Sequence, residues 1–282
     1  MAQDFAYTLY ATNAEYLCNA VMMLDALDRV DAKASKLLLY RKSWKGRETT
    51  KTFVGRLLAK AIDLGAILQP ITLQRSRGEI ATWADSYTKL LAFNQTRYKR
   101  VLSLDTDATV LQNLDDVFRY PAVPLAAPSA YWLEEPTLSS QMMLIEPSQD
   151  EFDKITDQIK HHKNGEFDME IINTLYNGSA SLIPHRPYDL LTGEFQKTDH
   201  SAYLGDMDLG WNATYELANA KFVHFSDWPL FKPWLLSADE LDRAKPPCRP
   251  SVDGSLQDCQ DQEAWLRVYK DFMERRQRIC NR

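Results

Sequence analysis

An apolar run that ends on two closely spaced carboxylates constrains this chain more than any other stretch. Residues 101–111 read Val-Leu-Ser-Leu-Asp-Thr-Asp-Ala-Thr-Val-Leu. The run predicts a buried strand that leaves its sheet at Asp105 and Asp107, whose side chains point the same way because alternate residues of a strand share a face. Two carboxylates this close repel each other unless a cation lies between them. Their oxygens suit a hard divalent ion such as Mg2+ or Mn2+, which in turn binds a diphosphate.

An acidic pair after a strand has an ordinary alternative, a turn that caps a helix. A bare Asp-x-Asp is short, and alone it favours that alternative. Its position after a strongly apolar strand favours a ligand site, because such sites in open α/β sheets lie beyond the carboxyl ends of strands.

Length and composition indicate one large globular domain, or a domain with an appendage. The chain has 282 residues, of which 45% are hydrophobic, enough for a sizeable core. Its formal net charge is -6, from 33 basic and 39 acidic residues, which argues against nucleic acid as a partner. No apolar stretch is long enough to span a bilayer, and residues 1–4 do not begin a signal peptide, so we expect any membrane anchor to lie outside this sequence.

Cysteines and glycosylation motifs bear on the compartment. The four cysteines are Cys18, Cys248, Cys259 and Cys280. None forms a Cys-x-x-Cys pair, which disfavours a zinc site. A disulfide among the last three would suit an oxidising compartment, and free thiols are the alternative. Asn-x-Ser/Thr sequons occur at Asn94, Asn177 and Asn212 and permit a lumenal location. We therefore expect a Golgi or secretory lumen, with the cytoplasm as the alternative.

The first part of the chain alternates between strand and helix patterns. Strands are predicted at residues 5–12, 36–40 and 66–68, and helices from Asn13 to about Arg29, from Thr49 or Thr50 to about Gly65, and from about Thr82 to Asn94. This alternation predicts a mostly parallel sheet with helices on both faces. The glycine motifs of dinucleotide-binding Rossmann domains and of P-loops are both absent from the sequence, which disfavours those functions.

The second part is less regular. We predict a helical turn at 113–118, strands at 125–127, 142–145 and 221–224, and helices from Ser148 and over 168–176. Residues 184–219 show no period and indicate a long functional loop. Pro246 and Pro247 mark a boundary between a main domain, 1–245, and a helical appendage, 246–282. Its helix, 262–279, is predicted to pack through Trp265, Val268, Tyr269 and Phe272 and to expose Arg275 and Arg276.

Four stretches of the chain occur in an order that is typical of one enzyme group. They are Thr8–Tyr16, Ser86–Leu90, Leu104–Asp107 with Leu111–Phe118, and His224-Phe225 with Lys232-Pro233-Trp234 after an insertion. Together they resemble the family 8 glycosyltransferases, the glycogenin and galactinol synthase group. The resemblance runs from about Phe5 to Trp234 and is closest to fungal members of the N-acetylglucosaminyltransferase-like kind.

The resemblance implies a GT-A fold, the Rossmann-like fold of nucleotide-diphospho-sugar transferases, over residues 1–245. It implies a retaining transfer of glucose, N-acetylglucosamine or galactose from a UDP-sugar to a glycan or other hydroxyl acceptor, with Mn2+; a homodimer is left open. The implied metal ligands are Asp105, Asp107 and His224. The implied nucleotide and phosphate contacts are Tyr10, Thr12, Asn13, Tyr16, Lys89, Thr106 and Lys232. The implied catalytic residues are Asp168 and Lys89.

The chemistry agrees with this assignment. Cleavage of a sugar from UDP needs a neutralised diphosphate, which a divalent ion and lysines supply. Retention of the sugar's anomeric configuration needs either a double displacement or attack from the face that the leaving group departs from. Asp168 is therefore either a nucleophile or a stabiliser of positive charge. The family often has Asn-Ser-Gly where this chain has Ser139-Ser140-Gln141, and Asp-Gln where it has Asp168-Met169, so the donor sugar stays open.

Two other functions compete. Residues 104–109 also fit the Asp-x-Asp-x-Thr motif of haloacid-dehalogenase-like phosphatases. That motif is expected near the first strand, whereas at least four predicted elements precede it here. The third candidate is a non-catalytic binder of nucleotide sugars.

Overall fold

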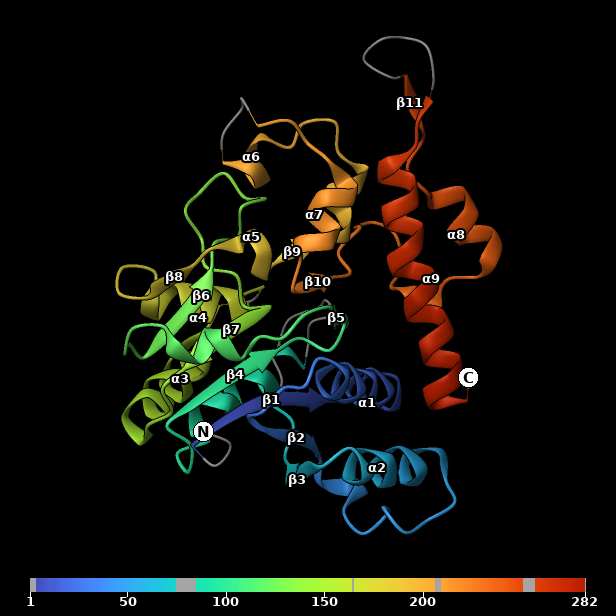
Figure 1. Ribbon diagram of the computed structural model, residues 1–282. Coiled ribbons are helices and arrows are strands. Elements are labelled where there is room, and N and C mark those ends of the chain that lie inside the picture. Colours follow the sequence, from blue (N-terminus) through green and yellow to red (C-terminus); the bar gives the residue numbers. More distant parts are fainter. Residues whose placement is uncertain (1–3, 75–84, 164, 206–208, 251–256, 282) are drawn as a thin grey trace.

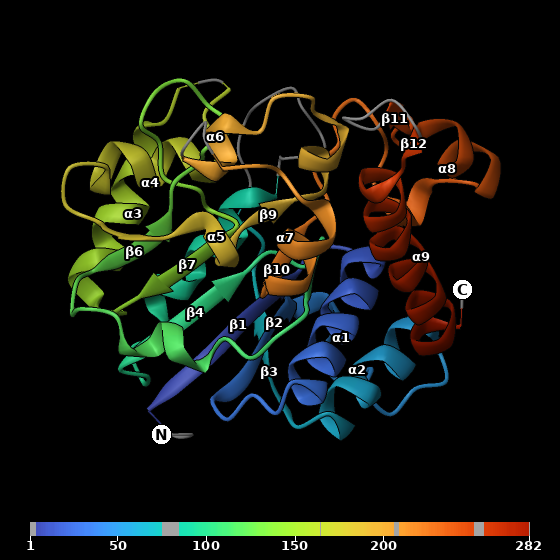
Figure 2. The same ribbon diagram turned by 45° about the horizontal axis from the view of Figure 1, so that its top comes forward.

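The computed structural model describes residues 4–74, 85–163, 165–205, 209–250 and 257–281. At its centre lies a seven-stranded sheet with helices on both faces (Figures 1 and 2), in the strand order β3-β2-β1-β4-β7-β6-β8. Its strands are β1 (Phe5–Ala11), β2 (Ser35–Arg41), β3 (Ala66–Ile71), β4 (Arg100–Leu104), β6 (Leu125–Pro128), β7 (Met142–Ile145) and β8 (Ser181–Ile183). Only β7 runs antiparallel to its neighbours in this described sheet, so the predicted mostly parallel α/β architecture is confirmed.

The two faces of the sheet contribute to separate hydrophobic cores. Along β1, Tyr7 and Leu9 belong to one core and Ala6 and Tyr10 to the other, because alternate side chains of a strand face opposite ways. The first core includes side chains of α1 (Ala14–Arg29), α2 (Phe53–Asp63) and α9 (Gln260–Cys280). The second includes side chains of the 3-10 helix η2 (Ser86–Asn94), α3 (Gln149–His161) and α4 (Asp168–Tyr176).

The strand order has a switch point between β1 and β4. The chain passes from β1 through β2 to β3 on one side and then places β4 on the other side of β1. Asn13 follows β1 at this point and caps α1, while Asp105 follows β4. Because ligands of open α/β sheets bind beyond the carboxyl ends of strands at such a switch, the topology places the acidic pair where a ligand site is expected.

The run 101–111 forms two strands. As predicted, Asp105 and Asp107 lie where β4 leaves the main sheet, but the residues beyond them form β5 (Ala108–Val110) of a second sheet. In that sheet β5 pairs with β10 (Phe222–His224), which pairs in turn with β9 (Leu190–Leu191). The acidic pair therefore occupies the crossing between two sheets.

Several predicted boundaries were wrong. Helix α2 begins at Phe53 because Thr52, not Thr49 or Thr50, caps it. The helix expected from Thr82 is a 3-10 helix from Ser86, and its predicted first residues lie outside the described residues.

Residues 184–219 are not a structureless loop. Besides β9 they contain α5 (His185–Tyr188), η4 (Thr192–Gln196), α6 (Ser201–Leu204) and α7 (Ala213–Asn219). Strand β8 and α8 (Ala238–Ala244) were also missed, as was the hairpin of β11 (Arg249–Pro250) and β12 (Gln257–Asp258). These elements have two to seven residues, too few to reveal a period.

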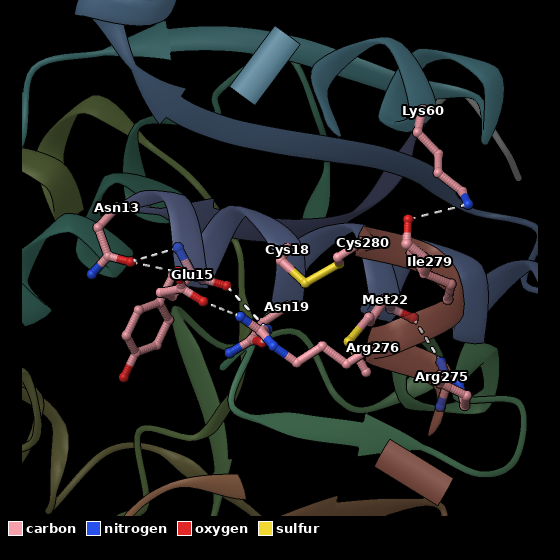
Figure 3. The surroundings of a disulfide bond; sticks show 11 residues. Asn13, Glu15, Cys18, Asn19, Met22, Lys60, Arg275, Arg276, Ile279 and Cys280 are labelled. Carbon is pink, nitrogen blue, oxygen red and sulfur yellow. Dashed lines mark hydrogen bonds and ion pairs between the residues drawn. A yellow bond between two sulfur atoms is a disulfide. The ribbon is translucent and has the colours of Figure 1, made fainter. Parts of the chain in front are cut away.

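The end of α9 is buried, contrary to the prediction of an exposed basic face. Arg275 and Arg276 are 5% and 6% exposed. Arg275 donates to the Met22 carbonyl at 2.9 Å, and Arg276 contacts Glu15 and Asn19 of α1 (Figure 3). The predicted packing residues of α9, Trp265, Val268, Tyr269 and Phe272, are all buried. Helix α9 thus packs along α1 as part of the core.

Two disulfides connect the cysteines. Cys248 pairs with Cys259 inside the C-terminal tract, as one of the predicted pairings, but Cys280 pairs with Cys18 of α1 (Figure 3). The division at residue 245 stays a prediction. No helix in the described part of the chain combines the length and apolar character that a bilayer crossing requires.

We expect loss of the Cys18–Cys280 bond to destabilise the protein strongly. A cross-link between residues 262 positions apart restricts the unfolded chain far more than the Cys248–Cys259 link, whose cysteines are 11 apart. The double variant Cys18→Ser/Cys280→Ser should lose roughly 3–5 kcal/mol of unfolding free energy, measured by urea titration. The matched variant Cys248→Ser/Cys259→Ser should lose less. Equal losses would contradict the assigned pairing.

Candidate functional site

Asp105, Asp107 and His224 come together at the crossing between the two sheets. One ligand atom of each lies within 4.8 Å of the others, and all three residues are buried. The β5–β10 pairing positions the histidine, because Ala108 lies opposite His224 in its register. His224 Nε2 is 3.3 Å from Asp107 Oδ1 and 4.0 Å from Asp105 Oδ2. Two carboxylates and an imidazole form a donor set that suits Mn2+ or Mg2+.

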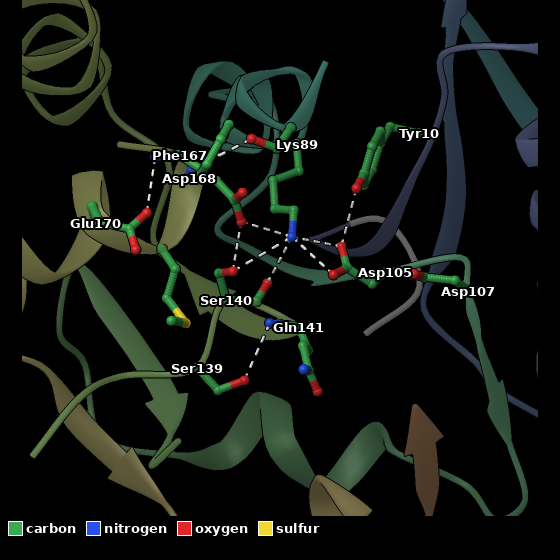
Figure 4. Close-up of polar contacts among 12 residues, drawn as sticks. Tyr10, Lys89, Asp105, Asp107, Ser139, Ser140, Gln141, Phe167, Asp168 and Glu170 are labelled. Atoms are coloured by element: carbon green, nitrogen blue, oxygen red, sulfur yellow. Dashed lines mark hydrogen bonds and ion pairs between the residues drawn. The ribbon is translucent and has the colours of Figure 1, made fainter. Parts of the chain in front are cut away.

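Lysines flank this cluster on both sides. Lys89 Nζ lies 2.8 Å from each oxygen of Asp105 and 2.8 Å from Asp168 Oδ2 (Figure 4). Ser140 Oγ donates to the same Asp168 oxygen at 2.5 Å. Lys232 Nζ lies 2.8 Å from Asp107 Oδ2. The structure therefore joins both predicted phosphate lysines, the predicted acid Asp168 and the predicted metal ligands in one network.

Burial and charge act differently on the three acids. Burial opposes the charged form of Asp107, but Lys232 and His224 hold its pKa well below the usual range. Burial also opposes a charged Asp168, yet Lys89 lowers its pKa. At Asp105, burial and the neighbouring Asp107 outweigh Lys89 and His224, so its pKa is raised. Of these three carboxylates, Asp105 is the one whose charged form a divalent cation would stabilise most.

Lys89 stays charged despite its burial. Desolvation opposes the ammonium form, but Asp105 and Asp168 together raise its pKa above the ordinary lysine value. Its side chain reaches the site from η2, and it is 5% exposed. A buried ammonium held by two carboxylates is a fixed positive charge, suited to an anionic ligand.

The residues predicted to hold the nucleotide lie around the end of β1. Tyr10 donates to Asp105 Oδ1 at 3.2 Å, and Thr12 is buried. The side chain of Asn13 accepts from two backbone N–H groups of α1 at 3.0 Å each, so its oxygen serves as the helix cap. Tyr16 packs edge-on against Trp234 with ring centroids 5.4 Å apart. Their nucleotide contacts remain predictions.

Within residues 105–107 and at His224, two buried side-chain polar atoms have no hydrogen-bond partner in the described part of the chain. These are the hydroxyl of Thr106 and Nδ1 of His224. Buried polar groups are normally paired, so an unpaired hydroxyl between the two aspartates supports a site that a ligand completes.

Sequence reasoning missed a fourth acid near the cluster. Asp189 is fully buried, and burial raises its pKa to about 7, although Ser139 and His224 oppose the shift. Asp189 comes directly before the two apolar residues of β9, and an acid at such a position is usually part of a turn. No sequence pattern around Asp189 indicates a functional residue.

A second missed group supports the segment after His224. Thr192 Oγ1 donates to Asp227, accepts from Ser226 N–H at 3.0 Å and lies 3.3 Å from the His224 carbonyl oxygen. Asp227 accepts from Trp265 Nε1 at 2.9 Å and from the Tyr269 hydroxyl at 2.7 Å. Helix α9 thereby fixes the backbone that carries the histidine.

The chain is similar to curated fungal proteins over 98% of its length. A protein of Gibberella zeae named glucose N-acetyltransferase 1 is 46% identical over 284 residues, and this chain spans 62% of it, less than two thirds. A protein of Aspergillus fumigatus with the same name is 39% identical over 296 residues, and this chain spans 77% of it. No known protein-family model matches the chain.

Among solved structures, the galactosyltransferase LgtC in complex with donor and acceptor sugar analogues is similar to this chain. The TM-score is 0.59 at 13% sequence identity, covering 98% of this chain and 96% of that one. At this identity the likeness concerns the fold, and it confirms the predicted GT-A fold.

We expect Mn2+ alone to stabilise the protein through the cluster. Because an ion that binds the folded state shifts the unfolding equilibrium, Tm should rise by about 5–10 °C when free Mn2+ is roughly 100-fold above its Kd. Asp107→Ala and His224→Ala should abolish that rise in a thermal shift measurement. Asp63→Asn, an exposed acid at the end of α2, is the control. An unchanged Mn2+ response in both cluster variants would place the ion elsewhere.

Asp189 should make stability depend on pH. Its folded pKa of about 7 lies above its ordinary value of 3.8, so the folded state binds more protons between these values and stability falls as pH rises. The cost above pH 7 is at most about 4 kcal/mol. Without metal, Asp189→Asn should therefore be more stable than the unmodified protein at pH 8, with the difference shrinking towards pH 4. A pH-independent difference in urea unfolding would contradict a titrating Asp189.

Proposed function

This chain belongs to the family of the fungal proteins named glucose N-acetyltransferase 1, and from that premise we propose that it is a metal-dependent, retaining glycosyltransferase. It transfers N-acetylglucosamine, or a related hexose, from a UDP-sugar to a hydroxyl of a glycan. One observation carries the proposal: the buried Asp105-Asp107-His224 cluster lies beyond β4 between Lys89 and Lys232. Membership of glycosyltransferase family 8 is part of this proposal.

Asp105, Asp107 and His224 are the residues that would hold Mn2+. A divalent ion held there would supply positive charge to the leaving diphosphate. Lys232, now paired with Asp107, is placed to add positive charge to the same phosphates. No side chain needs to protonate the leaving group, because UDP leaves as an anion stabilised by these charges.

Asp168 and Lys89 act at the sugar. The lowered pKa keeps Asp168 ionised, which both a nucleophile and a stabiliser of positive charge require. Its Oδ2 already accepts hydrogen bonds from Lys89 and Ser140, which favours the stabilising role because these donors reduce its nucleophilicity. Lys89 is the positioning group, since it holds Asp168 and the metal ligand Asp105 at once.

The nucleotide lies beyond the end of β1 in this proposal. Tyr10, Thr12, Asn13 and Tyr16 contact uridine, and the unpaired hydroxyl of Thr106 donates to the donor substrate. The nearby start of α1 adds the positive end of a helix dipole, which favours an anion.

The relatives' name leaves a second chemistry to test. "Glucose N-acetyltransferase" also describes transfer of an acetyl group. The GT-A fold and a cluster suited to a divalent cation favour transfer of a whole sugar. The same fold argues against the haloacid-dehalogenase-like phosphatase.

The two disulfides support placing the protein in a Golgi or secretory lumen, because such bonds persist in oxidising compartments. The homodimer stays a prediction.

The test is release of UDP from a panel of UDP-sugars, with UDP-N-acetylglucosamine first. We expect turnover with Mn2+ and loss with EDTA. Asp105→Ala should abolish turnover and weaken UDP binding in Mn2+, whereas Asp168→Asn should reduce turnover at least ~100-fold while retaining UDP binding, because only the first removes a metal ligand. Asp63→Asn should match the unmodified enzyme.

Three results would redirect the proposal. Full activity of Asp105→Ala would refute the site. Transfer from acetyl-CoA without UDP release would establish acetyl transfer. UDP binding without turnover of any donor would leave a nucleotide-sugar binder.

A further inference from the structure

A groove lies beside the cluster, walled by the segment 226–231. This segment is the insertion between His224-Phe225 and Lys232-Pro233-Trp234 noted in the sequence. The groove has a volume of about 870 Å3 and is also lined by residues of η4 and α8 and by Trp132. None of the metal ligands lines it, so it is distinct from the cluster itself.

The chain segment that forms one wall of the groove is directly connected to residues of the cluster. His224 and Lys232, which both contact Asp107, bracket the segment that forms its wall. On the opposite wall, Leu191 pairs with His224 in the β9–β10 ladder. A Cβ added at Gly193 would lie 2.5 Å from the Ser226 carbonyl oxygen, so the two walls touch at their base. A ligand in this groove would therefore lie beside the wall segment that connects His224 to Lys232, the two partners of Asp107.

The lining of the groove combines aromatic surface with charge. Trp228 is 84% exposed and Phe231 is 62% exposed. Lys197 and Arg243 supply cationic hydrogen-bond donors from η4 and α8. Aromatic faces pack against the C–H faces of sugar rings, and charged groups bond to sugar hydroxyls, so this mixture suits a carbohydrate better than a purely apolar ligand.

The wall segment is anchored on its inner side. Asp227, next to Trp228, accepts hydrogen bonds from Trp265 and Tyr269 of α9 and from Thr192. This anchoring fixes the backbone before a ligand arrives, which reduces the ordering cost of binding.

We propose that this groove binds the acceptor glycan, with Trp228 as the platform for a sugar ring and Arg243 as a partner for its hydroxyls. The proposal rests on the proposed function and adds to it the place and chemistry of the acceptor. It assigns the insertion 226–231 to acceptor specificity, whereas the cluster and its lysines serve the donor.

The test separates acceptor from donor kinetics. Lactose, cellobiose, maltose and mannobiose serve as probes, with UDP release as the readout. Trp228→Ala should raise the KM of every disaccharide used as acceptor by about tenfold. The KM for the UDP-sugar and its slow hydrolysis without acceptor should not change, because no cluster residue is altered. Arg243→Gln should act in the same direction. Tyr215→Ala, which removes an aromatic side chain 59% exposed on α7, is the matched control.

Saturation-transfer NMR with the same disaccharides tests binding without turnover. The unmodified protein should show transfer to a bound sugar, and Trp228→Ala should lose it. Unchanged acceptor KM and unchanged transfer in both groove variants would overturn the proposal, as would equal losses in Tyr215→Ala. If no UDP-sugar is turned over while saturation transfer still depends on Trp228, the proposed function fails and the carbohydrate groove stands.

Discussion

The charge balance of one buried cluster of side chains is the constraint on which the rest of the structure depends. Three carboxylates, those of Asp105, Asp107 and Asp168, face the two ammonium groups of Lys89 and Lys232. Burial makes any uncompensated charge costly. The helices and strands that carry these groups must therefore be fixed relative to one another, so that opposite charges stay close together. The excess negative charge lies at Asp105, whose pKa is raised. In the proposed function, a divalent cation and a diphosphate would bind together, and their opposite charges would leave this balance nearly unchanged.

The strands that carry part of the cluster are short, and contacts with α9 give them additional support. The histidine lies on β10, a strand of three residues paired with a β5 of equal length. Arg275 of α9 donates to Thr109 of β5 at 3.1 Å, and Trp265 and Tyr269 hold Asp227 beyond β10. The C-terminal helix therefore supports both strands of the small sheet. Helix α1 is fixed to the same support through the Cys18–Cys280 bond.

Features with a local signal could be predicted from the sequence. Asn13 caps α1 as its position before an apolar period indicated, and α4 spans the predicted residues 168–176. The apolar run before the acidic pair predicted a buried strand, and β4 is that strand. Only the ordered set of motifs joined His224 to that pair, since nothing in its own surroundings distinguishes a ligand from a buried histidine at a strand end. The structure places them together, and the roles still rest on the proposed chemistry.

Features that depend on distant partners could not be predicted. Arg275 and Arg276 belong to a helix with charges on several faces, and a buried arginine there has the same sequence pattern as an exposed one. Cys280 has nearer candidates for a partner in Cys248 and Cys259, so spacing alone could not select Cys18. The wrong prediction for the arginines and the missed Cys18–Cys280 pair have one cause: the period of α9 reveals a helix, but not that α1 covers its last turns. Once that contact is known, the arginines must find partners on α1, and the two sulfur atoms meet.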